Sequence, residues 1–127
     1  MSFWRRDVID PALDHQTNAH IAEQRAWIER EPANPRPYYH LAQLYRVANR
    51  PDEALGLLLE SVRLDPTFAD AQVSLAEIYA VRADYPAAWR HAFIAEQHGN
   101  SSAADLLRRY GVPPSTAPSS TPPPDPE

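Results

Sequence analysis

Two stretches of the chain, residues 35–66 and 69–100, carry the same residue pattern at an offset of 34 positions. Five residues recur unchanged: Leu41, Ala42, Tyr45, Val47 and Ala54 reappear as Leu75, Ala76, Tyr79, Val81 and Ala88. A fixed period of this length is typical of helical hairpins that stack, because one hairpin cannot bury both of its apolar faces alone. The repeat therefore predicts an all-α chain. Chains of this kind usually hold other molecules and seldom perform chemistry.

Helical periodicity supports this prediction within each stretch. In the first, Tyr38, Leu41 and Tyr45 are three, four and seven positions apart, so they share one face of an amphipathic helix. Ala42 and Ala54 are expected where two helices approach closely and only a small side chain fits. The apolar fraction of 43% is sufficient for one small domain of 127 residues.

Proline and aspartate mark where these helices begin and end. Pro51 suits the first turn of a helix, where its missing N–H is not needed. In the second stretch Asp84 is the predicted N-cap, and Pro86 falls within the first helical turn. Pro66 ends the first hairpin, because the residue before a proline is pushed out of the helical region.

Further helices are expected on both sides of the repeats. One is predicted over residues 10–31, with Asp10 as N-cap and Pro11 as first helical residue, in front of Pro32. Since Pro32 lies 34 positions before Pro66, this helix is either an N-terminal capping or docking helix or a degenerate repeat. A short C-terminal capping helix is predicted over 101–110.

The remaining segments lack a folding pattern. We expect residues 1–9 to be a flexible N-terminus and 10–112 to form the helical domain. Residues 113–127 contain seven prolines and no large apolar side chain, so we expect a disordered Pro/Ser/Thr-rich tail.

Composition argues against several kinds of chemistry. With no cysteine, disulfides and thiolate sites are excluded, and the net charge of -5 gives no electrostatic footprint for nucleic acid. No segment is apolar enough to span a membrane or serve as a secretory signal, so a cytoplasmic location is expected. His91 and His98 lie seven apart, but no carboxylate completes a known metal-ligand spacing. We predict no catalytic residues, no metal site and no cofactor.

The two stretches resemble the tetratricopeptide repeat, a helix-turn-helix unit of 34 residues. Tyr38, Leu41, Ala42, Tyr45 and Pro66 stand at family positions of the first copy. The second copy departs from the pattern, as a terminal repeat would, at three positions: Gln72, Ala92 and Asn100. The resemblance implies a right-handed α-α superhelix, a TPR-like solenoid of about six helices.

The resemblance also implies a concave groove lined by the first helix of each hairpin. Groove residues carried over position by position are Arg36, Tyr39, Gln43, Arg46 and Val47, then Asp70, Val73, Glu77, Ala80 and Val81. This mixture of aromatic, polar and charged side chains suits an extended or helical peptide with apolar anchors.

Three functional hypotheses follow. The leading one is a non-enzymatic interaction module, adaptor or scaffold that binds a protein or peptide in this groove. The second is self-assembly into a homo-oligomer, with Phe3 and Trp4 docking on a neighbouring copy. The third, of low weight, is a metal-dependent enzyme that combines His40 with a residue of the N-terminal helix.

Overall fold

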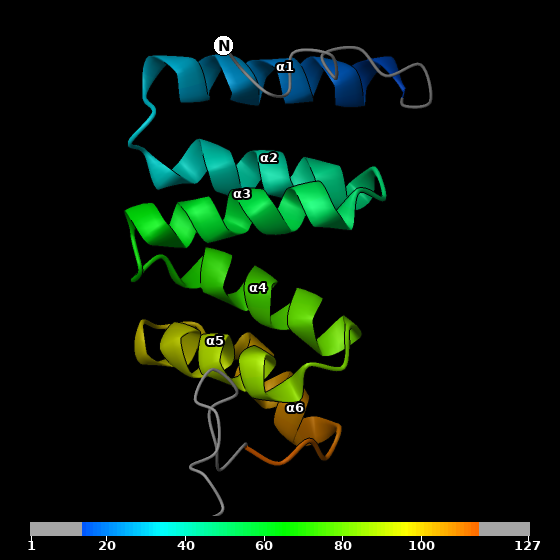
Figure 1. Ribbon diagram of the computed structural model, residues 1–127, viewed down its shortest axis with the longest axis vertical. Coiled ribbons are helices and arrows are strands. Elements are labelled where there is room, and N and C mark those ends of the chain that lie inside the picture. The colour runs from blue at the N-terminus through cyan, green and yellow to red at the C-terminus, as the bar shows by residue number, and fades with distance from the viewer. Residues whose placement is uncertain (1–13, 115–127) are drawn as a thin grey trace, which may run out of the picture. The chain divides into compact units, whose positions relative to one another are not determined.

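The computed structural model describes residues 14–114 of the chain, and this range contains six α-helices and no strand (Figure 1). In chain order these are α1 (His15–Arg30), α2 (Pro35–Val47), α3 (Pro51–Leu64), α4 (Ala69–Val81), α5 (Tyr85–Gln97) and α6 (Ser102–Arg109). The prediction of an all-α repeat fold with about six helices is confirmed. The predictions for residues 1–13, Phe3 and Trp4 included, and for the tail 115–127 lie outside the described residues.

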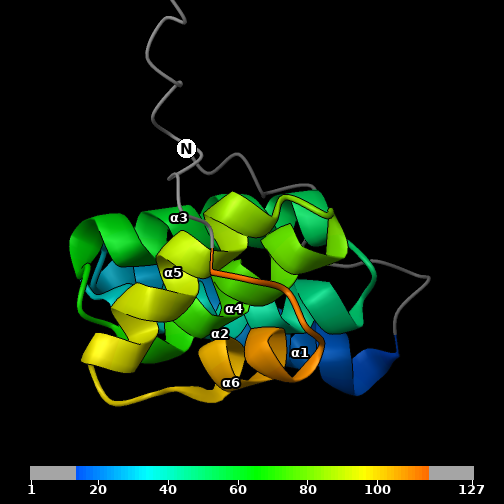
Figure 2. The same ribbon diagram turned by 90° about the horizontal axis from the view of Figure 1, so that it is seen from below.

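The described residues form two compact units, which divide between Leu64 and Asp65. The first unit contains α1, α2 and α3, and the second contains α4, α5 and α6. Within the first, α2 packs against both α1 and α3; within the second, α4 packs against α5, and α6 against both (Figure 2). Equivalent helices α2 and α4 begin and end 34 positions apart, as the period requires.

The helix α1 begins later than the sequence predicted. Its N-cap is Asp14, not Asp10, because the Asp14 carboxylate accepts hydrogen bonds from the Thr17 backbone N–H at 2.7 Å and the Thr17 hydroxyl at 3.0 Å. The backbone bond from Thr17 is the largest reason why the pKa of Asp14 lies below its usual value, and the Thr17 hydroxyl is the next. An oxygen that reaches the N–H three residues ahead is what a helix start requires.

Both hairpins turn through a residue with left-handed backbone conformation. Asn49 has φ 63° and Ala83, 34 positions later, has φ 61°. The next N–H in each turn, from Arg50 or Asp84, donates to the carbonyl five residues earlier, at 2.8 and 2.9 Å respectively. This is the hydrogen bond of a Schellman ending, which satisfies a carbonyl of the last helical turn.

Each unit buries a polar side chain at the same repeat position. In each unit this side chain donates a hydrogen bond to the carbonyl of the equivalent proline. In the first unit the Tyr38 hydroxyl donates to the Pro32 carbonyl at 2.7 Å. In the second, Gln72 donates through Nε2 to the Pro66 carbonyl at 2.9 Å. A proline carbonyl has no intrahelical donor there, so different side chains meet the same requirement.

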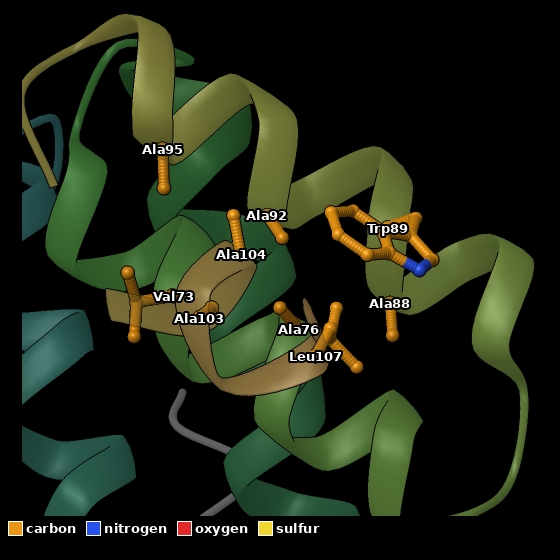
Figure 3. Packing of buried hydrophobic residues seen from close by; sticks show 9 residues of the cluster. All are labelled: Val73, Ala76, Ala88, Trp89, Ala92, Ala95, Ala103, Ala104 and Leu107. Carbon is orange, nitrogen blue, oxygen red and sulfur yellow. The ribbon is translucent and has the colours of Figure 1, made fainter. Parts of the chain in front are cut away.

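The core of the second unit is built largely from small side chains around one tryptophan. Trp89 on α5 is 1% exposed, and its Nε1–H donates to the Val112 carbonyl at 3.2 Å. The buried cluster joins α4, α5 and α6 (Figure 3), and its members are Val73, Ala76, Ala88, Trp89, Ala92, Ala95, Ala103, Ala104 and Leu107.

The two turns allow a reciprocal test of backbone strain. Left-handed conformation costs an ordinary L-residue about 1–2 kcal/mol, and asparagine tolerates it better than alanine. We expect Ala83→Asn to raise the free energy of unfolding by about 1 kcal/mol and Asn49→Ala to lower it by a similar amount. Urea unfolding followed by circular dichroism measures both. A change of the same sign in the two variants would contradict this explanation.

Candidate functional site

The predicted groove residues of the first unit form one face of α2, opposite its core face. Arg36 and Val47 are exposed, Val47 to 80%, while the three between them are half-buried: Tyr39, Gln43 and Arg46. The core of this helix uses other residues, such as Leu41 and Tyr45. We call these five groove residues the site face of α2.

Two aromatic rings beside this face were not predicted as part of the site. The His40 ring stacks on Trp27 of α1, with centroids 6.2 Å apart and planes at 17°. The Tyr39 ring also meets the His40 ring edge-on, with centroids 5.2 Å apart. No periodic signal in the sequence pairs Trp27 with His40, because the two residues lie on different helices. His40 thus packs against a ring of α1, and the described residues contain no group of three His, Cys, Asp or Glu side chains able to hold a metal ion.

In the second unit, the predicted groove residues of α4 differ in their exposure to solvent. Asp70 is exposed, Glu77 and Ala80 are half-buried, and Val81 is 86% exposed. Val73 is only 8% exposed and belongs to the core cluster with α6 (Figure 3). Val73, predicted as a groove residue, is thus packed in the core of this unit.

The helix α6 is the physical reason for that difference. It packs on both α4 and α5, and its apolar side chains cover Val73 and approach Ala76. What stays open between α4 and α6 is a recess lined by Ala76, Glu77, Ala80, Ala103, Leu106 and Leu107. The site face of α4 then consists of Asp70, Glu77, Ala80 and Val81.

The two helices that carry the site faces, α2 and α4, differ in the sign of their charged residues. Helix α2 contains Arg36 and Arg46 and no acidic residue, whereas α4 contains Asp70 and Glu77 and no basic residue. Arg46 also lies within hydrogen-bond distance of Gln43, with Nη1 and Oε1 3.4 Å apart. The charged side chains of the two site faces are therefore of opposite sign.

His91 on α5 has a packing role. Its Nδ1 lies 2.7 Å from Oε1 of Gln72, and its ring stacks on Tyr79 with centroids 5.5 Å apart. Because the Pro66 carbonyl only accepts hydrogen bonds, Gln72 must turn its amide nitrogen there and its oxygen to His91. The Nδ1 atom therefore carries the proton of a neutral ring. Burial, with a smaller effect from Arg90, lowers the pKa of His91 to about 4.

A family model of the tetratricopeptide repeat matches residues 14–91, which is more than half of the chain. The chain belongs to the tetratricopeptide repeat family. The match includes α1 and ends within α5, before α6 begins. No curated protein matches the sequence significantly. None of the described helices of this tetratricopeptide repeat protein is long and apolar enough to cross a membrane.

The buried His91 predicts a pH dependence of stability. Its pKa is about 4 in the folded chain and about 6.5 when unfolded, so between these values only the unfolded chain binds the proton. The free energy of unfolding should therefore fall as pH falls from about 6.5 to 4, by roughly 2–3 kcal/mol from this group.

A variant that removes the titrating ring tests this. Gln72→Tyr with His91→Leu installs the residues that the first repeat has at the same positions, Tyr38 and Leu57. His91→Gln is the second variant, since it keeps a donor for Gln72 and does not titrate near neutral pH. Unfolding free energies of wild type and variants, measured from pH 7 to 4, should diverge as pH falls. Curves that stay parallel would show that His91 does not cause the change in unfolding free energy in this pH range.

Proposed function

We propose that this chain is a non-enzymatic interaction module, an adaptor or scaffold, that binds a protein or peptide segment through the site faces of α2 and α4. The observation that carries the proposal is the site face of α2: five residues on one side of a packed helix, none of which serves the core. Exposed and half-buried side chains of this kind are accessible to a partner.

The residue types on this face support binding to a protein surface. Tyrosine and arginine are the side chains that most often dominate binding energy at interfaces, and Tyr39 and Arg46 lie seven residues apart on the same face of α2. The Tyr39 ring is held against His40, so less conformational freedom is lost when a partner packs on it. Val47 adds an apolar contact that is 80% exposed.

The family supports the same class of function, since tetratricopeptide repeats generally mediate protein–protein interactions. Helix α2 carries only cationic charge and α4 only anionic charge. We infer that a partner bears an acidic group where it meets α2 and a basic group where it meets α4. Complementary charges of this kind govern specificity and association rate more than they govern affinity.

Removing the two side chains most suited to binding tests the proposal. We expect Tyr39→Ala with Arg46→Ala to abolish capture of the principal partner from a lysate of the source cells. Capture is measured with immobilised full-length chain and quantitative mass spectrometry. Helicity by circular dichroism should be retained, because neither residue belongs to the core.

A matched control removes the same two residue types from the other helices. Arg63 on α3 and Tyr85 on α5 have exposed side chains, so Arg63→Ala with Tyr85→Ala should capture the partner normally. Equal capture by all three proteins would contradict the proposed site.

A further inference from the structure

Helix α1 packs against α2 with one side and leaves a second side open. The residues of this open side are exposed or half-buried: His20, Glu23 and Gln24. We propose that residues 2–9 of the same chain, which lie outside the described range, dock on the open side of α1 as an antiparallel helix. The inference is independent of the proposed function, which concerns the site faces of α2 and α4.

The 34-residue period shows what the open side corresponds to in the rest of the fold. The residues of α3 that lie 34 positions after it are all buried: Ala54, Leu57 and Leu58. In the first unit, α2 precedes α3 and packs against it. By this correspondence α1 is the second helix of a hairpin, and its open side is the side that a preceding helix covers.

The segment before α1 has apolar residues where such a helix needs them. Trp4 lies 34 positions before Tyr38, and Val8 lies 34 positions before Ala42. Tyr38 and Ala42 are both buried residues of α2. Residues four positions apart share one face of a helix, so Trp4 and Val8 can meet the open side of α1 together. Residues 2–9 show no extended folding pattern in the sequence alone, so their placement depends on this face of α1.

A contact in the second unit gives the register of the docked segment. There Gln72 of α4 meets His91 of α5, with Oε1 and Nδ1 2.7 Å apart. Two periods earlier the same positions hold Trp4 and Glu23. The Trp4 indole can only donate a hydrogen bond, and the side-chain oxygens of Glu23 and Gln24 accept. Gln24 Oε1 is buried without a hydrogen-bond partner, so a donor at this place satisfies it.

The next opposed pair in this register is also complementary. Three residues forward on one antiparallel helix and three back on the other lead from Trp4 and Glu23 to Asp7 and His20. Their equivalents in the first unit, Leu41 and Ala54, are both 0% exposed. A carboxylate opposite an imidazole forms a charge-assisted hydrogen bond when the ring is protonated. The two polar residues that depart from the core pattern are therefore suited to each other.

The attachment of the segment favours it over the same segment of a second copy. Pro11 cannot lie inside a helix, so the turn falls at residues 10–13, in front of the Asp14 cap. Helix α1 begins at His15, two positions ahead of the equivalent of Pro51, which moves the turn in the same direction. A connection of this length is ordinary between packed helices and gives an effective concentration that is roughly millimolar. At micromolar protein concentration the chain's own segment therefore occupies the face.

Disulfide trapping tests the docked register, because the chain contains no cysteine. Val8→Cys with His20→Cys places thiols at the equivalents of Ala42 and Ala54. We expect mild oxidation of the 127-residue chain to give a monomer with an intramolecular disulfide, detected by peptide mass spectrometry. The control is Val8→Cys with Ala26→Cys, an exposed position turned about 120° around α1 from position 20. It should form the bond at least about tenfold more slowly.

Equal rates at positions 20 and 26 would overturn the proposal, because an undocked segment reaches both. A disulfide between two copies in place of the intramolecular one would assign the open side to a second copy, and would overturn it as well.

A charge exchange tests the same register without engineered thiols. Asp7→Arg should speed amide hydrogen exchange of α1 about fivefold, because the pair with His20 is lost. His20→Glu alone should speed it too, since it opposes two carboxylates. The two substitutions together restore opposite charges and should return exchange toward the wild-type rate. Exchange in the double variant that is as fast as in the single variants would contradict the pairing of these two positions.

Discussion

Close approach of the paired helices is the constraint on which the rest of the structure depends. Four alanines stand at the two equivalent places in the hairpins, Ala42 with Ala54 and Ala76 with Ala88, and none is more than 1% exposed. A larger side chain at any of them would push its helices apart, because interiors are packed without spare volume. With the crossing held at the same small residues, α2 and α4 present corresponding faces.

The two repeats satisfy the same hydrogen-bonding requirement with different side chains. The carbonyls of Pro32 and Pro66 both need a donor, which is a tyrosine hydroxyl in one unit and the Gln72 amide in the other. The choice of glutamine leaves an amide oxygen in the core, and that oxygen is satisfied by His91. One substitution in the first helix of the repeat therefore required a second polar residue in the other helix. It also placed a group with a shifted pKa in the core.

The flanking helices give the two site faces different surroundings. On α2, the neighbouring α1 contributes Trp27, which stacks on His40 beside the face. On α4, α6 buries Val73 and converts part of the face into the recess at Glu77 and Ala80. A family-level view of the repeats treats both faces as equivalent. In this chain their flanking helices and charges differ, so under the proposed function each face would meet a different part of a partner.

The sequence by itself determined the helices, the turns and the family. The starts at Pro51 and Asp84 and the ends before Pro66 were predictable because caps, prolines and a 3.6-residue period act over a few neighbouring residues. The start of α1 shows the limit of that reasoning: the sequence pattern predicted Asp10 as the cap, and the hydrogen bonds to Thr17 identify Asp14. The five residues on the site face of α2 were carried over from the resemblance to the tetratricopeptide repeat, which assigns positions along one helix without reference to its neighbours.

Only the tertiary structure decided how α6 covers Val73, how Gln72 meets His91 and which ring stacks on His40. Each depends on side chains that are distant in the chain and meet only after the helices have packed. Their partners are selected by shape and by the need to satisfy buried polar groups, and neither leaves a periodic signal in the sequence. The repeat thus predicted where recognition should be sought on each helix. Packing determined which of those positions remain accessible.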